Sequence, residues 1–159
     1  MGWPDDWDER RAGVGCGMCE GAGVDDKPNG VRILDGRFTD AYLGRHPVRP
    51  GYCYVVWKGR HVCEPTELSA EELAGFWAEV TQVARAIEQR YSPRKLNVLS
   101  LGNWVPHLHV HLVPRHDDDP RAAQPLEAEA FAAAEANTID EVELRAEVEA
   151  LRGLLRSTP

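Results

Sequence analysis

The chain has 159 residues, of which 43% are hydrophobic and 28% charged, a composition typical of a soluble globular domain with a core of its own. Its formal net charge of −8 argues against broad binding to nucleic acid or to an anionic membrane, because no basic surplus is available to neutralise phosphates. No apolar run approaches the roughly 20 residues of a membrane-spanning helix, and the acidic N-terminus lacks the apolar segment of a signal peptide. These properties predict one domain in the cytoplasm.

Two cysteines with metal-ligand spacing follow a polar N-terminal lead-in, residues 1–14. Cys16 and Cys19 form a Cys-x-x-Cys pair inside a glycine-rich stretch, where the backbone can curl so that both sulfurs face one ion. In a cytosolic chain this spacing favours metal or redox chemistry over a disulfide, and the βαβ setting of a redox motif is absent. If the pair binds a metal, two further ligands must lie elsewhere in the chain.

Several short stretches predict β-strands. Residues 31–34 and 38–43 are separated by an Asp-Gly pair, which is typical of a hairpin turn. Residues 52–57 are rich in β-branched and aromatic residues and follow a Pro-Gly loop. A further strand is expected at residues 95–99, followed by a turn at residues 100–103.

Two amphipathic helices complete the regular structure. Ser69 and Glu72 form a capping box for a helix that should end near Tyr91. After Pro125 the chain is dominated by Ala, Glu and Leu, within a C-terminal segment of residues 121–159. Four apolar residues of this segment share one helical face: Leu144, Val148, Leu151 and Leu155. This stripe must be buried, so we expect a C-terminal helical extension that packs on the domain or on a partner subunit.

Residues 107–113 have a pattern that is unusual for a purely structural segment. Histidines alternate with aliphatic residues, which is the period of a half-buried strand. The aliphatic residues should face the core, while His107, His109 and His111 crowd together on the other face. Such a cluster indicates metal binding, nucleophilic or acid–base chemistry, or a division of the histidines between these roles.

Metal binding has two alternative arrangements. Cys16, Cys19, His61 and one strand histidine would complete a closed structural zinc site. A catalytic zinc bound by the three strand histidines is the rival. It is geometrically awkward because residues 107 and 111 are roughly 13 Å apart on an extended strand. It would also leave the cysteines unused, so the residues favour the structural site.

The remaining histidines suit chemistry at phosphorus. His109, in the middle, is the natural nucleophile, provided that a carbonyl holds its Nδ1–H and leaves Nε2 bare. Asn97, Asn103 and His111 could contact the oxygens of a phosphate or the leaving group. No carboxylate occurs between Leu96 and Arg115, although the chain as a whole is acidic. That absence supports an anion-binding pocket.

Residues 96–106, followed by His107-x-His109-x-His111, resemble the histidine-triad (HIT) family of nucleotide hydrolases and transferases. The resemblance implies an α+β fold for residues 15–120, with an antiparallel sheet of about five strands and one main helix, usually assembled as a homodimer. It implies that His109 attacks an α-phosphate to form a nucleotidyl-histidine, which water then releases as a nucleoside monophosphate. Asn97, Asn103 and His111 would contact the phosphate or leaving group.

The resemblance extends to the zinc-containing members, typical of bacteria. Their metal ligands correspond here to four residues: Cys16, Cys19, His61 and His107. Three positions depart from the family pattern, one of them Asn103, where some members carry Gln or Ser. Gly44 stands where an acidic residue or Asn often holds the ribose, so that contact is missing or is supplied by Arg45 or His46. Tyr52 replaces the histidine that usually follows the glycine of the Pro-Gly loop.

Three functions are compatible with these residues. The first is a zinc-containing hydrolase of nucleoside monophosphate conjugates, such as phosphoramidates or dinucleoside polyphosphates. The second is a phosphorylase or nucleotidyltransferase that uses the same histidine with a different acceptor. The third is a non-enzymatic nucleotide-binding dimer.

Overall fold

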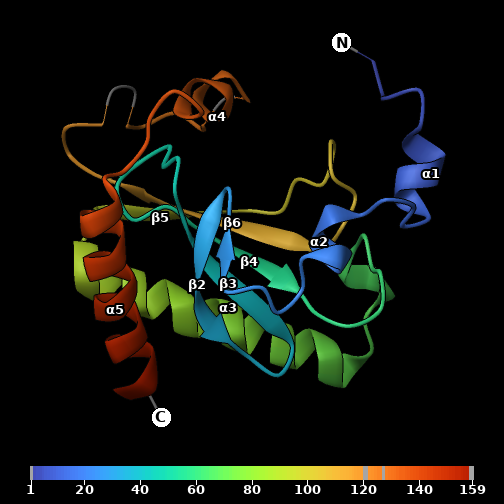
Figure 1. The fold of residues 1–159 in the computed structure, drawn as a ribbon, viewed down its shortest axis with the longest axis horizontal. Coiled ribbons are helices and arrows are strands. Elements are labelled where there is room, and N and C mark those ends of the chain that lie inside the picture. Colours follow the sequence, from blue (N-terminus) through green and yellow to red (C-terminus); the bar gives the residue numbers. More distant parts are fainter. Residues whose placement is uncertain (1, 120–121, 127, 158–159) are drawn as a thin grey trace.

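The chain folds around an antiparallel sheet of six strands, which confirms the expected α+β architecture (Figure 1). The computed structural model describes residues 2–119, 122–126 and 128–157. The elements follow in this order: α1 (Trp7–Arg11), α2 (Gly17–Glu20), β1 (Asp26–Lys27), β2 (Gly30–Asp35), β3 (Thr39–Gly44), β4 (Cys53–Trp57), the 3-10 helix η1 (Pro65–Glu67), α3 (Ala70–Tyr91), β5 (Lys95–Leu99), β6 (His109–Arg115), α4 (Ala128–Ala134) and α5 (Glu141–Ser157).

The strand order β1-β2-β3-β4-β6-β5 places the histidine strand inside the sheet. β6 pairs with β4, where Val110 lies opposite Val55, and on its other side with β5, where His111 lies opposite Leu99. The strand beyond the five expected is β1, a two-residue strand at the sheet edge. Its Asp26 pairs with Val31 of β2, and its Lys27 pairs with Gly30. Backbone ladders on both sides therefore fix the direction in which each β6 side chain points.

The long helix α3 covers one face of the sheet. Its N-terminus has the expected capping box: Ser69 Oγ accepts from Glu72 N–H, and the Glu72 carboxylate accepts from Ser69 N–H. Phe76 and Ile87 are fully buried against the sheet. Burying one such side chain contributes about 1.5–3 kcal/mol, so packing determines where α3 lies.

The C-terminal helix α5 joins the same hydrophobic core. Its apolar stripe lies against α3 and β2: Leu144, Val148, Leu151 and Leu155. Polar contacts flank the stripe, since Glu147 accepts hydrogen bonds from Arg90 and from the Tyr91 hydroxyl. Among the described helices, none combines the length and apolar character needed to cross a bilayer.

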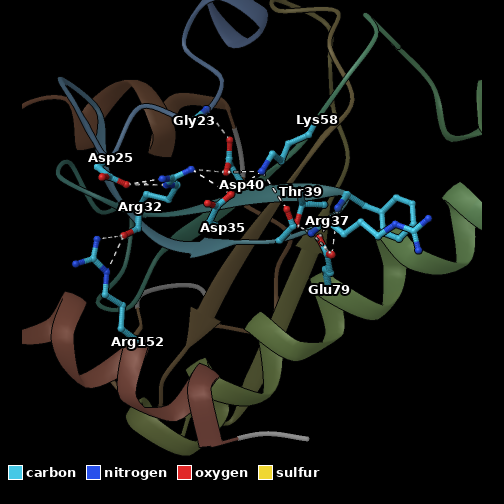
Figure 2. A network of polar contacts seen from close by, with 12 residues as sticks. Gly23, Asp25, Arg32, Asp35, Arg37, Thr39, Asp40, Lys58, Glu79 and Arg152 are labelled. Atoms are coloured by element: carbon cyan, nitrogen blue, oxygen red, sulfur yellow. Dashed lines mark hydrogen bonds and ion pairs between the residues drawn. The ribbon is translucent and has the colours of Figure 1, made fainter.

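A buried carboxylate on β3 ties the N-terminal segment to the sheet (Figure 2). Asp40 is 1% exposed, and its oxygens accept hydrogen bonds from Arg32 at 3.0 Å and from Gly23 N–H at 2.9 Å. Lys58 adds an ion pair at 3.5 Å. Because Gly23 lies between α2 and β1, this network holds the cysteine-bearing segment in place.

Asp40→Asn should lower the free energy of unfolding by about 3 kcal/mol, because it removes the buried negative charge that pairs with Arg32 and Lys58. The matched control is Asp35→Asn. Its carboxylate also pairs with Lys58 but is 63% exposed, so the loss should stay below about 1 kcal/mol. Urea denaturation of both variants measures the difference. Equal losses would show that burial of Asp40 has no special role.

Candidate functional site

Four side chains that are distant in sequence converge beside the sheet: Cys16, Cys19, His61 and His107. Their ligand atoms all lie within 4.8 Å of one another. Cys19 Sγ is 3.4 Å from Nδ1 of both histidines, and Cys16 Sγ is 3.4 Å from Nδ1 of His107. Tetrahedral zinc, with bonds of roughly 2.0–2.3 Å, spaces its ligand atoms roughly 3.3–3.8 Å apart. The cluster could therefore bind a metal ion with little rearrangement.

Local structure explains why these residues meet. The two cysteines are three positions apart around the one-turn helix α2, so both face the same side. The two histidine segments are joined by a hydrogen bond from Leu108 N–H to the Val62 carbonyl. Gly13, with φ of +86°, allows close approach, since a Cβ there would lie 2.9 Å from the His61 ring.

The tautomer of His107 leaves a lone pair directed at the other residues of the cluster. His107 Nε2 lies 3.0 Å from the Trp57 carbonyl oxygen, which can only accept, so Nε2 carries the proton and Nδ1 offers its lone pair to the metal position. Burial, followed by the neighbouring Cys16 thiol, raises the pKa of Cys19 to about 11. A dication would reverse this shift because it favours the thiolate.

His107 is separated from the other two histidines of the run. β6 begins at His109, so the prediction that the strand includes His107 was wrong. The backbone of Leu108 bonds to Val62 as well as to Trp57, which ends the regular ladder at this point. Consequently His107 belongs to the Cys/His cluster, whereas His109 and His111 lie on the strand.

The His109 imidazole is held in one tautomer. Its Nδ1 lies 2.6 Å from the His107 carbonyl oxygen, so Nδ1 donates and the lone pair is on Nε2. Its Nε2 lies 3.1 Å from Nε2 of His111. Burial lowers the pKa of His109, which keeps the ring neutral near pH 7. This is the geometry that a histidine nucleophile requires.

The buried histidines predict a loss of stability in mild acid. Burial, with a smaller effect of His109, lowers the pKa of His111 from 6.5 to about 4. Between these values the unfolded chain binds more protons than the folded one, so the free energy of unfolding falls as the pH falls from 6.5 towards 4, by on the order of 2 kcal/mol. Denaturation at each pH measures this slope. The His111→Gln variant should show a flatter curve over the same range, and an unchanged curve would contradict the assignment.

His109 and His111 open into a cavity of about 500 Å³ on the sheet face opposite the α3 core. Its walls come from α2 on one side and α4 on the other. The described lining residues are Met18, Pro28, Asn29, His46, Tyr52, Tyr54, His109, His111, Phe131, Ala134 and Glu135. Phe131 packs against His111, with ring centroids 5.3 Å apart. The C-terminal segment of the same chain thus closes one side of the site.

The two asparagines suggested by the sequence do not line this cavity. Asn97 Oδ1 accepts a hydrogen bond from the Arg115 guanidinium at 2.8 Å, and Asn97 lies two residues from Leu99, the partner of His111. Asn103 is exposed in the loop between β5 and β6. Ser100 is closer to the histidines, since its hydroxyl donates to the His109 carbonyl at 3.3 Å.

Some cavity residues were missed by the sequence argument. The replacement of a family histidine by Tyr52 was noticed, but only the structure shows its hydroxyl 2.7 Å from His111 Nδ1. Asn29 accepts from the Tyr54 hydroxyl at 3.0 Å, and no local pattern marked it. Phe131 lies in an Ala/Glu-rich stretch where a lone aromatic residue is an ordinary core residue. Only their positions in the folded structure identify these residues as part of the cavity wall.

The ring of Tyr52 leaves no room for a side chain at Gly44. A Cβ at this position would lie 2.6 Å from Tyr52 Cδ1, so the tyrosine ring occupies the space that a longer side chain would need. The next residue, Arg45, is engaged by Asp26 and Glu141. His46 lines the cavity.

Sequence comparison identifies relatives of this chain. Residues 32–118, more than half of the chain, match the family model for the HIT domain. The chain is 30% identical over 88 residues to the bis(5'-nucleosyl)-tetraphosphatase (asymmetrical) of Schizosaccharomyces pombe, covering 52% of this chain and 48% of that protein. It is 34% identical over 96 residues to the AP-4-A phosphorylase of Mycobacterium tuberculosis, covering 57% and 49%. The chain thus spans about half the length of these curated relatives.

Solved structures share the fold. A histidine triad protein from Bradyrhizobium japonicum superposes with a TM-score of 0.71 at 24% identity, over 80% of this chain and 91% of that one. A Zn-bound histidine triad family protein from Mycobacterium smegmatis has a TM-score of 0.60 at 23% identity, over 90% and 92%. The match over residues 32–118, on a fold that these structures share, shows that this chain belongs to the HIT domain family.

Proposed function

We propose that the chain is a nucleotide hydrolase that cleaves the α-phosphate bond of a nucleoside monophosphate conjugate through a covalent nucleotidyl-His109 intermediate. The observation that carries this proposal is the His109 ring, whose Nδ1 is held by a carbonyl while Nε2 lies in the cavity beside His111. The names of the relatives, a tetraphosphatase and a phosphorylase, support a reaction at phosphorus in a nucleotide.

The reaction has two displacements. In the first, the Nε2 lone pair of His109 forms an N–P bond and the P–O or P–N bond to the leaving group breaks. The electron pair stays on a leaving oxygen, whereas a leaving nitrogen takes up a proton from solvent. The adjacent His111 donates a hydrogen bond to the reacting phosphate group. In the second, a water oxygen forms a P–O bond, the N–P bond breaks, and the nucleoside monophosphate leaves with one proton released to solvent.

The cavity supports a substrate with two parts. A second hollow of about 490 Å³ adjoins the histidine cavity and shares Met18, Pro28, Asn29 and Tyr54 with it. Lys27 lines this second hollow and could attract an anionic group. Two adjoining spaces of this size fit a nucleotide joined to a leaving group better than a single small metabolite.

Phosphate and ribose contacts are assigned as follows. Asn97 could reach the cavity only by giving up Arg115, and Asn103 only by movement of its loop, so we assign phosphate binding to His111 first. For the ribose, Arg45 is already paired with carboxylates, whereas His46 lines the cavity. We therefore propose His46 for the contact that Gly44 does not provide.

Product analysis distinguishes the hydrolase from the phosphorylase. A panel of adenylate and guanylate conjugates should yield nucleoside monophosphate, with one oxygen from labelled water. If inorganic phosphate at millimolar concentration diverts the product to nucleoside diphosphate, the phosphorylase is the correct reading. Binding without turnover of any conjugate, measured by calorimetry, would support the non-enzymatic nucleotide-binding dimer.

We propose that the cluster of Cys16, Cys19, His61 and His107 holds a structural zinc ion. Two thiolates and two imidazoles are the ligands of closed zinc sites, in which no position is open for substrate. When bound, zinc would join the N-terminal segment to the ends of β4 and β6. The ion then supports the strand that bears His109 and takes no part in the reaction.

We also propose a homodimer formed through the β5 edge of the sheet. β5 pairs only with β6 among the described strands, and the residues around it include exposed apolar side chains: Val98 (48%), Leu101 (53%) and Trp104 (62%). An unpaired apolar edge favours pairing with another chain.

Light scattering should give twice the 17.7 kDa chain mass for the wild type. Val98→Lys should shift it towards the monomer, because lysine on an edge strand opposes pairing. The control Val142→Lys changes a residue that is 79% exposed on α5 and should leave the mass unchanged. A wild-type mass of one chain would contradict the dimer.

A further inference from the structure

Tyr52 contacts the partner of the proposed nucleophile. Its hydroxyl oxygen lies 2.7 Å from His111 Nδ1, and the two ring planes are nearly parallel, with an interplanar angle of 14° and centroids 6.0 Å apart. Phe131 packs edge-on against the tyrosine ring at 6.2 Å. Contacts with Phe131 and with the backbone at Gly44 therefore restrict the Tyr52 ring and keep its hydroxyl directed at His111.

Three hydrogen bonds link His107 to His109, His109 to His111, and His111 to Tyr52. Their directions follow from one carbonyl group. The His107 carbonyl can only accept, so His109 Nδ1 carries the proton and its Nε2 is an acceptor. His111 Nε2, at 3.1 Å, must then donate. A neutral His111 that carries its proton on Nε2 has a lone pair on Nδ1, so the hydroxyl of Tyr52 must donate to it.

We infer that Tyr52 is a positioning residue that fixes His111 as the Nε2–H tautomer, so that His111 donates a hydrogen bond to the leaving atom as it separates from phosphorus. The inference rests on the proposed function. No proton is transferred from His111: the P–O electron pair stays on the leaving oxygen, and the Nε2–H stabilises the charge that develops there.

The opposite tautomer would work against the reaction. With the proton on Nδ1, His111 would donate to the Tyr52 oxygen, and its Nε2 lone pair would face the Nε2 lone pair of His109. The same lone pair would face the negative leaving atom. Burial lowers the pKa of His111 to about 4 and raises the pKa of Tyr52, so at neutral pH the imidazole is neutral and the phenol keeps its proton.

Gly44 and Tyr52 act as a pair in this arrangement. The ring of Tyr52 fits because Gly44 has no side chain, as a Cβ there would lie 2.6 Å from the ring. The departures from the family pattern at Gly44 and Tyr52 are thus explained by one feature: a tyrosine that reaches His111 where the family usually has a histidine.

Tyr52→Phe tests the inference, because it removes only the hydroxyl and keeps the packed ring. With adenosine 5'-monophosphate esters of phenols of graded acidity, kcat should fall roughly 10- to 100-fold for poor leaving groups. It should fall much less for p-nitrophenol, and KM should change little. The control is Tyr91→Phe, which also removes a hydroxyl with a 2.7 Å hydrogen bond, here to Glu147, and should leave kcat unchanged.

Nitrogen-15 NMR of histidine-labelled protein reads the tautomer directly, with His111→Gln as the assignment control. The wild type should show the proton of His111 on Nε2, and Tyr52→Phe should show a mixture. A wild-type proton on Nδ1, or a kcat loss equal for all leaving groups, would overturn the inference. Failure of the proposed function is a separate result: no nucleotide adduct on His109 in the wild type.

Discussion

His109→Ala should lower turnover of every nucleotide conjugate by about 10⁴-fold or more, because the variant lacks the atom that we propose forms the covalent intermediate. His111 is the nearest alternative base, but its Nε2 carries the proton that faces His109, so it offers no lone pair to phosphorus. Binding should persist, since most of the cavity wall is unchanged. Calorimetry should therefore show nucleotide affinity within about tenfold of the wild type.

Chemical trapping tests the proposed intermediate directly. Incubation with a conjugate labelled at the α-phosphate, followed by rapid quench in base, should leave the label on the peptide that contains residue 109. His116→Ala is the control, because His116 lies after β6 and does not line the histidine cavity. Wild-type hydrolysis by His109→Ala across the panel would show that the nucleophile is another group.

Loss of the metal cluster should have the largest effect on stability. We expect about one zinc ion per chain in the wild type and almost none in Cys19→Ser. The variant should lose several kcal/mol of unfolding free energy, because structural zinc sites contribute their binding energy to folding. The ion would link α2 to the segments that follow β4 and precede β6, and no disulfide among the described residues does so.

Cys63→Ser is the matched control for this experiment. Cys63 Sγ lies 3.4 Å from His61 Nε2, on the side of the ring away from the cluster, and 2.9 Å from the Pro106 carbonyl oxygen. The serine variant should keep its zinc. If chelation removes zinc and activity is lost while the fold remains, the ion is catalytic and our structural assignment is wrong. Full zinc content in Cys19→Ser would exclude the cluster.

Hydrophobic periodicity and local motifs in the sequence predicted most of the helices and strands. The Ser69–Glu72 capping box begins α3, and the aliphatic residues between the histidines are buried in the core. These features depend on contacts within a few residues, so a sequence can express them. The start of β6 was misplaced because a hydrogen bond to Val62, 46 positions away, replaces the sheet ladder at Leu108.

The candidate site shows the same division. By itself the sequence determined the residue types: thiols at Cys-x-x-Cys spacing, a histidine after the long strand, and three alternating histidines, which point to metal binding and to chemistry at phosphorus. Only the tertiary structure decided their arrangement. It separated His107 from His109, left Asn97 with Arg115, and placed Tyr52 on His111. These pairings depend on sheet register and on the packing of α2 and α4, which join residues far apart in the chain and leave no local pattern.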